Sequence, residues 1–123
     1  AALIKALGDE NWQVREAGAE TLAKAGSAAI EADLIAALDD EYWQVRLKAV
    51  RSLGKLGLSA GAPKIGPMMA LDIPNLRKEC AAVLGELADP ASVVFLEEFR
   101  DDADPDVRKN VRWALDKIAQ SAA

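Results

Sequence analysis

One spacing of 31 residues runs through the whole chain of 123 residues. Four arginines stand at this step with no insertion between them: Arg15, Arg46, Arg77 and Arg108. Four leucines keep the same step: Leu22, Leu53, Leu84 and Leu115. Residues 3–26 and 34–57 are identical at 13 of 24 aligned positions, which indicates duplication. A strict period of this length indicates a solenoid, in which one supersecondary unit repeats and stacks on its neighbours.

The period divides the chain into four helical hairpins, with about eight helices in a single all-α domain that we expect to form an α-α superhelix. The four repeats cover about 1–26, 27–57, 58–88 and 89–123. Apolar periodicity predicts helices near 1–8, 11–25, 28–38, 42–56, 63–71, 74–87, 90–100 and 105–120. The residue before each arginine belongs to the expected buried stripe of each second helix: Val14, Val45, Leu76 and Val107.

The third repeat breaks the pattern in its first half. Gly61, Pro63, Gly66 and Pro67 stand where a regular helix is expected. Proline lacks a backbone donor and clashes with the preceding turn, so Pro67 must begin a short helix or kink a longer one. We therefore predict a shortened helix here, and this irregularity favours a natural chain over an engineered repeat protein.

Composition excludes several classes of function. The chain is 51% hydrophobic but only 5% aromatic, which suits a helical core of Ala, Leu, Val and Ile. Its net charge of -5 opposes neutralisation of phosphates, so we expect no nucleic-acid partner. No apolar run approaches the roughly 20 residues needed to span a bilayer. We therefore expect a soluble, cytoplasmic protein without a membrane partner.

Catalytic and ligand-binding motifs are missing as well. The sequence contains no histidine, which removes histidine triads, histidine metal sites and the usual general base near neutral pH. The single cysteine, Cys80, cannot form an internal disulfide, and it stands at a buried-stripe position, which indicates core filling rather than a nucleophile. No phosphate-binding glycine loop follows a strand. We expect no enzyme activity, no catalytic residue, no metal and no cofactor.

The repeated residues resemble a known family. The run D-x-x-x-Q-V-R is present from Asp9 and again from Asp40, and each is followed by a small residue, Gly18 or Ala49, that opens a small-x-x-x-L-x-K-x-G stretch. This pattern resembles the HEAT-like repeat of bilin lyases, prokaryotic scaffold proteins and artificial binding scaffolds. The resemblance implies that the first helix of each pair lies on a convex side and that the second lines a concave side. It also implies protein binding, because only a few members of the family are enzymes.

The four arginines have two readings, functional and structural. An aspartate stands six residues before the arginine in three repeats, as Asp9, Asp40 and Asp102. Such a carboxylate at a helix start lies within reach of an arginine of the same helix or of the next repeat, and the planar guanidinium suits a bidentate bond. We favour a structural ladder over a binding role.

The candidate binding residues flank the buried stripe of the second helices and differ between repeats. They are Trp12, Trp43, Gln44, Leu47, Lys48, Arg51, Lys78, Lys109 and Trp113. Tryptophan and arginine are enriched at the energetic centres of interfaces. Trp12 and Trp43 occupy equivalent positions, so a structural role as plugs over the loop between helices stays open for both. Trp113 has no equivalent tryptophan, which favours a partner-binding role.

The leading hypothesis is a non-catalytic protein interaction or scaffold module that binds its partner on the concave face. The basic residues of this face favour an acidic segment of the partner, although solvated lysines would give the same pattern. The alternative is a bilin-lyase-like or chaperone-like subunit that handles a tetrapyrrole-bearing protein. Leu3, Ile4 and Leu7 lie on a terminal helix, so we also expect weak end-to-end self-association.

Overall fold

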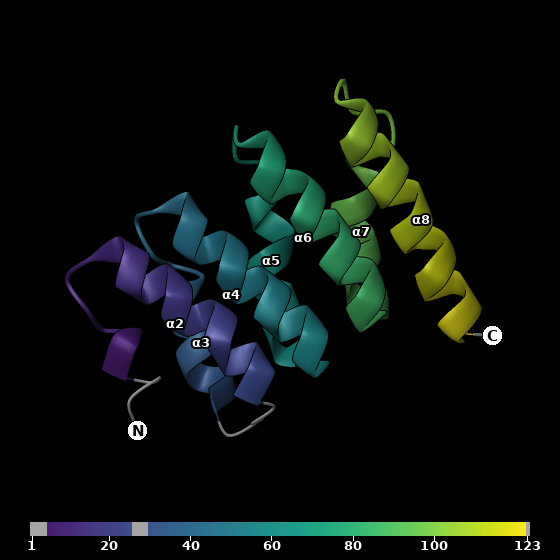
Figure 1. Cartoon of the computed structure of the whole chain (residues 1–123). Helices are drawn as coiled ribbons and strands as arrows, with labels where there is room; N and C mark the ends of the chain where they lie inside the picture. The colour runs from purple at the N-terminus through teal and green to yellow at the C-terminus, as the bar shows by residue number, and fades with distance from the viewer. Residues whose placement is uncertain (1–4, 26–29, 123) are drawn as a thin grey trace. The chain divides into compact units, whose positions relative to one another are not determined.

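The computed structural model describes residues 5–25 and 30–122, and over these residues the chain forms seven α-helices and no strand (Figure 1). The expected all-α class is confirmed. The contacts fall into two compact units, Ala1–Gly61 and Ala62–Ala123, which we describe separately. In the described part of the chain, each helix is too short or too polar to traverse a lipid bilayer.

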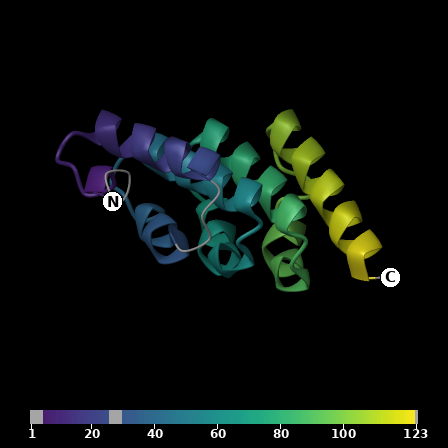
Figure 2. The same cartoon turned by 60° about the horizontal axis from the view of Figure 1, so that its bottom comes forward.

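In the first unit, two fourteen-residue helices lie side by side: α2 (Trp12–Ala25) and α4 (Trp43–Leu56). The shorter α3 (Glu31–Ala37) packs against α4, below the layer of α2 and α4 in Figure 2, and the 3-10 turn η2 (Ser59–Gly61) contacts both α3 and α4. Leu34, Val45 and Leu53 are fully buried between these elements.

The ends of these helices follow the capping residues of the sequence. The side chain of Asn11 accepts a hydrogen bond of 2.8 Å from the amide of Gln13, which satisfies a free N–H in the first turn of α2. Gly57 ends α4 with φ of 67°, a left-handed conformation that favours glycine. The helix predicted near 42–56 therefore ends at Leu56, as expected.

The second unit repeats the arrangement with less regular first helices. The second helices α6 (Pro74–Leu87) and α8 (Pro105–Ala122) lie side by side. The first helices are α5 (Ala62–Met68), which packs against α6, and α7 (Val93–Glu97), which packs against α8 and follows the 3-10 turn η3 (Pro90–Ser92). Pro74 opens α6 and Pro105 opens α8, as predicted.

Three boundaries differ from the sequence prediction. Helix α5 ends at Met68 instead of residue 71, and Pro67 lies inside its last turn rather than at its start. Residues 90–100 do not form one helix: the carboxylate of Asp89 accepts a bond from the amide of Ala91, a 3-10 turn follows, and α7 ends at Glu97. Residues 1–4 and 26–29, which include parts of two expected helices and Gly26, lie outside the described residues.

Val14 was expected on the buried stripe, and this expectation is wrong. Its side chain is 39% exposed, whereas the equivalent Val45, Leu76 and Val107 are at most 1% exposed. The physical reason is its position on α2. Lys48 and Ser52, which share a face of α4 with Val45, contact Glu20 and Ala19 of α2. The corresponding face of α2 is turned away from α4, so α4 cannot cover Val14.

Candidate functional site

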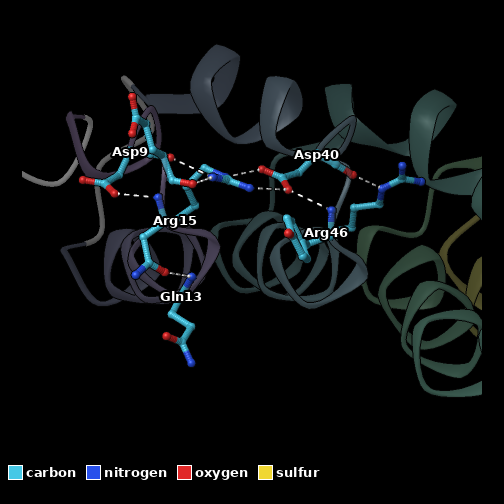
Figure 3. Close-up of polar contacts among 8 residues, drawn as sticks. Asp9, Gln13, Arg15, Asp40 and Arg46 are labelled. Atoms are coloured by element: carbon cyan, nitrogen blue, oxygen red, sulfur yellow. Dashed lines mark hydrogen bonds and ion pairs between the residues drawn. The ribbon is translucent and has the colours of Figure 1, made fainter.

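An arginine clasp joins the two hairpins of the first unit. The guanidinium of Arg15 donates from Nε to Oδ2 of Asp40 at 2.7 Å and from Nη2 to Oδ1 at 3.2 Å (Figure 3). Its Nη1 donates to the main-chain carbonyls of Asp9 at 2.7 Å and Glu10 at 2.9 Å. The ring of Tyr42 lies 5.6 Å from the guanidinium carbon. Arg15 thus links the loop of its own hairpin to the loop of the next.

The second unit contains the same clasp 62 residues later, at two steps of the period. Arg77 forms an ion pair with Asp102 and donates from Nε to the carbonyl of Met69 at 2.7 Å. The ring of Phe99 lies 5.3 Å from its guanidinium carbon, so an aromatic ring lies beside this arginine too, although it comes from a different position of the repeat than Tyr42. The repeated arginines Arg15 and Arg77 therefore join neighbouring hairpins, as the structural interpretation predicted.

The direction of the clasp corrects the prediction. Each carboxylate receives the arginine of the preceding repeat, not that of its own helix or of the next repeat. The arginine that follows each aspartate within its own repeat makes a different bond. Arg46 donates to the main-chain carbonyl of Asp40 (Figure 3), and Arg108 donates to that of Asp102. Each loop aspartate therefore engages two arginines, one through its side chain and one through its main chain.

The clasp also sets the ionisation of the two aspartates. Burial of Asp40 raises its pKa, but the hydrogen bond from Arg15 and the amide of Tyr42 outweigh this effect, so the pKa lies below its ordinary value. The pKa of Asp102 is lowered in the same way by Arg77 and by the amide of Asp104. Both carboxylates are ionised near neutral pH, which keeps each clasp charged on both sides.

On the second helices of the first unit, a charged hollow of about 70 Å³ is lined by Glu20, Lys48, Arg51, Ser52 and Lys55. Lys48 reaches Glu20 at 3.4 Å across the two helices, and the Ser52 hydroxyl donates to the carbonyl of Ala19. The structure therefore brings the predicted Lys48 and Arg51 together. Sequence reasoning missed Glu20 and Ser52, although Glu20 stands at the position equivalent to Arg51 and Trp113.

The other predicted residues of the first unit lie near the helix starts. The indole of Trp12 stacks on the ring of Tyr42, with centroids 5.4 Å apart and planes at 17°, which supports the structural reading for Trp12. Trp43, Gln44 and Leu47 are half-buried on the first two turns of α4. The amide oxygen of Gln44 is buried and has no hydrogen-bond partner among the described residues.

In the second unit, Trp113 is the main exposed aromatic side chain of the second helices. It lies on α8, is 47% exposed, and its ring rests against Gly85 of α6: a Cβ at Gly85 would come within 2.5 Å of Cζ3 of Trp113. Only glycine leaves room for this contact. The indole is therefore held in place on one side and open to solvent on the other.

The predicted lysines of the second unit lie on the same two helices. Lys78 of α6 reaches Asp106 at 3.9 Å, and its carbonyl accepts a bond of 2.9 Å from Nδ2 of Asn110 on α8. Lys109 is exposed. Sequence reasoning missed the role of Gly85 and Asn110, because the contacts that they make link residues about one period apart and leave no local pattern.

The buried thiol has the properties of a core residue. Cys80 is fully buried, and burial, followed by the charge of Glu79, raises its pKa to about 12. The thiol therefore stays protonated at neutral pH and is shielded from solvent. Over the described residues, no three His, Cys, Asp or Glu side chains gather in a way that could hold a metal ion.

Comparison with known proteins places these features in a family. The family model that matches is that of HEAT repeats, over residues 1–73. Human deoxyhypusine hydroxylase, solved in complex with glycerol, is 29% identical, with a TM-score of 0.81 over 97% of this chain and 43% of that chain. The complex of CpcE and CpcF of phycocyanin lyase from Nostoc sp. PCC7120 contains a chain that is 25% identical, with a TM-score of 0.85 over 98% of this chain and 53% of that chain.

An engineered protein has the same fold at 20% identity, with a TM-score of 0.78 over 96% of this chain and 61% of that chain. This chain therefore spans less than two thirds of the length of each of these three proteins. No protein of curated function matches the sequence. The matches confirm the resemblance to HEAT-like repeats and the helical repeat architecture.

Proposed function

Because this chain belongs to the family of HEAT repeat proteins, we propose that it is a non-catalytic module that binds a protein partner through the exposed surface of its second helices. The observation that carries this proposal is Trp113, a large aromatic side chain that is 47% exposed yet packed against Gly85. An indole that is already ordered loses little conformational entropy on binding. Such a residue suits the centre of an interface.

The second helices of the first unit favour an acidic segment of the partner. Lys48, Arg51 and Lys55 border one hollow, where Glu20 is the only acidic side chain. Electrostatic complementarity of this kind raises association rates and selects partners more than it adds affinity. We therefore propose that the first unit selects an acidic segment of the partner and that Trp113 of the second unit makes the main apolar contact.

The absence of catalysis in this proposal rests on the side chains that are available. The chain contains no histidine, and its single thiol is buried with a raised pKa. Neither general base catalysis by histidine nor attack by a thiolate is open to these groups. Binding to a nucleic acid is opposed by the net charge of -5.

Affinity capture from a lysate of the source cell tests the proposal. The wild-type chain is compared with Trp113→Ala and with a control on a first helix, Val94→Ala, because Val94 is also exposed, at 69%, on α7. We expect Trp113→Ala to lose the captured protein and Val94→Ala to retain it. Lys109→Glu gives a second test, since Lys109 is exposed on the same helix as Trp113. Equal capture by all three variants would refute the proposal.

The likeness to the phycocyanin lyase subunits supports a second candidate function. Under this alternative the chain is a bilin-lyase-like or chaperone-like subunit that handles a tetrapyrrole-bearing protein. Adding a tetrapyrrole and recording its visible absorbance separates the two: a spectral shift that saturates at one equivalent supports the lyase-like role. An unchanged spectrum at equimolar concentration contradicts it.

Self-association is the remaining part of the proposed behaviour. We propose that two copies associate end to end only weakly. Leu7 is half-buried, and Leu3 and Ile4 lie outside the described residues, so this proposal now depends mainly on the exposed Val14. Sedimentation equilibrium that shows a pure monomer at millimolar concentration would contradict it.

A further inference from the structure

The charged hollow on the second helices of the first unit carries a net positive charge. Lys48, Arg51 and Lys55 follow one another on α4 at steps of three and four residues, which places their side chains on one face of the helix. Glu20 of α2 is the one acidic residue among the five that line the hollow. Three positive charges and one negative charge therefore leave a net charge of +2 around a volume of about 70 Å³.

The hydrogen-bond donors that line this hollow are charged side chains. Ser52 is buried, and its hydroxyl donates to the main-chain carbonyl of Ala19, so its one proton is already used. Main-chain amides in the middle of an α-helix are bonded within the helix. Lysine and arginine side chains thus remain to meet a ligand, and they select it by its negative charge.

The three cations of the hollow are not equivalent. Lys48 reaches Glu20 at 3.4 Å, and its side chain is only 19% exposed. Arg51 and Lys55 are exposed on the following two turns, and Lys55 makes no ion pair within the described residues. The planar guanidinium of arginine can donate to two oxygens of one phosphate, whereas a lysine acts as a point charge. Arg51 and Lys55 are therefore the main candidates to hold an oxyanion.

The second unit has a different charge on the corresponding face of α6. At the three equivalent positions the chain has Glu79, Ala82 and Glu86. Burial, followed by the charge of Glu79, raises the pKa of Glu86, which shows that this environment disfavours further negative charge. An anion is thus repelled at these positions of α6, and anion binding is specific to the first unit.

We propose that the charged hollow binds a phosphorylated side chain in an acidic segment of the partner. This inference rests on the proposed function, because it names the chemistry that the first unit recognises. A phosphate monoester carries about -1.5 to -2 charges at neutral pH and has three strong acceptor oxygens, which match the net charge and the donors of the hollow. A carboxylate carries a single negative charge and leaves part of the positive charge uncompensated. Phosphorylation of the partner therefore strengthens its binding.

Two peptides of otherwise identical sequence test the proposal, one with phosphoserine and one with glutamate at the centre of an acidic segment. Titration calorimetry with the full chain measures both affinities. We expect the phosphopeptide to bind at least about fivefold tighter at neutral pH. Its affinity is expected to fall as pH is lowered through the phosphate pKa of about 6. The affinity of the glutamate peptide is expected to stay constant down to about pH 5, because the pKa of its carboxyl group is about 4.3.

Variants of the lining residues locate the binding. Arg51→Ala is expected to weaken phosphopeptide binding about tenfold, the scale of a lost hydrogen bond to a charged group. Glu20→Gln is expected to strengthen it, because the change removes the opposing charge and releases Lys48. The matched control is Arg112→Ala, which removes an exposed arginine of α8 in the second unit and is expected to change affinity by no more than about twofold. Circular dichroism checks that each variant keeps its helices.

Three results would overturn the proposal. They are equal affinity for the two peptides, unchanged phosphopeptide affinity in Arg51→Ala, and binding of inorganic phosphate as tight as that of the phosphopeptide, which would indicate a site for the free anion.

Phosphatase treatment of the lysate separates this inference from the proposed function. Loss of the captured partner after treatment is the expected result. Unchanged capture that still requires Trp113 would leave the proposed function standing and overturn the phosphate site.

Discussion

The two units share one clasp and differ in the surfaces around it. Arg15 and Arg77 each bind the loop aspartate of the next repeat and a main-chain carbonyl, although Nε binds the aspartate in Arg15 and the carbonyl in Arg77. An aromatic ring lies beside each guanidinium. Their second helices, in contrast, present a charged hollow in the first unit and the indole of Trp113 in the second. Residues repeated at the period thus build the contacts between hairpins, whereas residues that change from repeat to repeat form the surface that we propose for binding.

The first helices differ as well. Helix α3 is regular, but α5 contains Gly66 and Pro67, and α7 is preceded by a 3-10 turn. At Gly66 a Cβ would lie 2.4 Å from Cδ2 of Phe95, so the ring of α7 packs directly on the backbone of α5. Gly66, in the irregular first half of the third repeat, thus leaves room for the ring of Phe95. The second helices are not changed by this contact.

The largest effect is expected from truncating the equivalent leucines Leu53 and Leu115. Leu53 is fully buried, so Leu53→Ala is expected to cost about 2 to 5 kcal/mol of unfolding free energy through lost contacts and a cavity. Leu115 is 9% exposed beside the charged end of the second unit, so Leu115→Ala is expected to cost less than half as much. Urea unfolding measures both. Equal losses would show that Leu115 is packed as tightly as Leu53.

The next effect is expected at the close contact that is specific to the second unit. Gly85→Ala places a Cβ 2.8 Å from Cα of Ala114 and 2.5 Å from the indole of Trp113. Because a backbone atom cannot move aside cheaply, we expect a loss of about 1 to 3 kcal/mol. At the control Gly8→Ala, the new Cβ would meet among the described residues only the carbonyl of Lys5, at an ordinary contact distance of 3.7 Å, so this variant is expected to be nearly neutral. Thermal melts that show no difference between the two variants would contradict this contact.

A smaller effect is expected from neutralising either clasp. Asp40→Asn and Asp102→Asn keep the shape of the side chain but remove its charge, so each is expected to cost about 1 kcal/mol at neutral pH, the scale of one partly exposed charged hydrogen bond. The folded pKa of each aspartate is lowered, so its contribution is fully present above the unfolded pKa of about 3.9 and is lost as pH falls through the folded pKa.

The difference in stability between wild type and either variant should therefore shrink below about pH 4. Denaturant unfolding between pH 7 and pH 2 measures it. A difference that does not change with pH in one unit but does in the other would show that the two clasps are not equivalent.

The smallest effect is expected from the exposed ion pairs. Arg100→Ala removes the 3.0 Å pair with Glu97, and Arg112→Ala removes the 3.1 Å pair with Asp101. Both variants are expected to change stability by no more than about 0.5 kcal/mol, because solvent screens such pairs. A larger loss from Arg112→Ala in urea unfolding would mean that this side chain stabilises the fold.

The residues that join the hairpins were predictable because they recur at the period of 31 residues. The period located the arginines, the aspartates and the starts of α4, α6 and α8 within one or two residues. The direction of the clasp was not predictable, since the spacing from Asp40 is six residues to Arg46 but 25 to Arg15, and only the structure shows which side chain points to which. Val14 was misplaced because periodicity assumes that every repeat has the same neighbours.

The surface that we propose for binding was only partly predictable, for a related reason. Lys48, Arg51 and Trp113 were chosen as candidates because they differ from the equivalent residues of the other repeats. The close packing of Trp113 on Gly85 depends on the distance between α6 and α8, and this distance cannot be read from the sequence. The same is true of the stacking of Trp12, because its partner Tyr42 belongs to the next repeat.

We propose that the second helices, and not the first, bind the partner. The direct measurement is the dissociation constant of the captured partner by titration calorimetry, for the wild type, Trp113→Ala and Val94→Ala. We expect affinity to fall by at least about tenfold for Trp113→Ala, the scale of an interface hot spot, and to change by no more than about twofold for Val94→Ala. A loss of affinity confined to Val94→Ala would instead place the interface on the first helices.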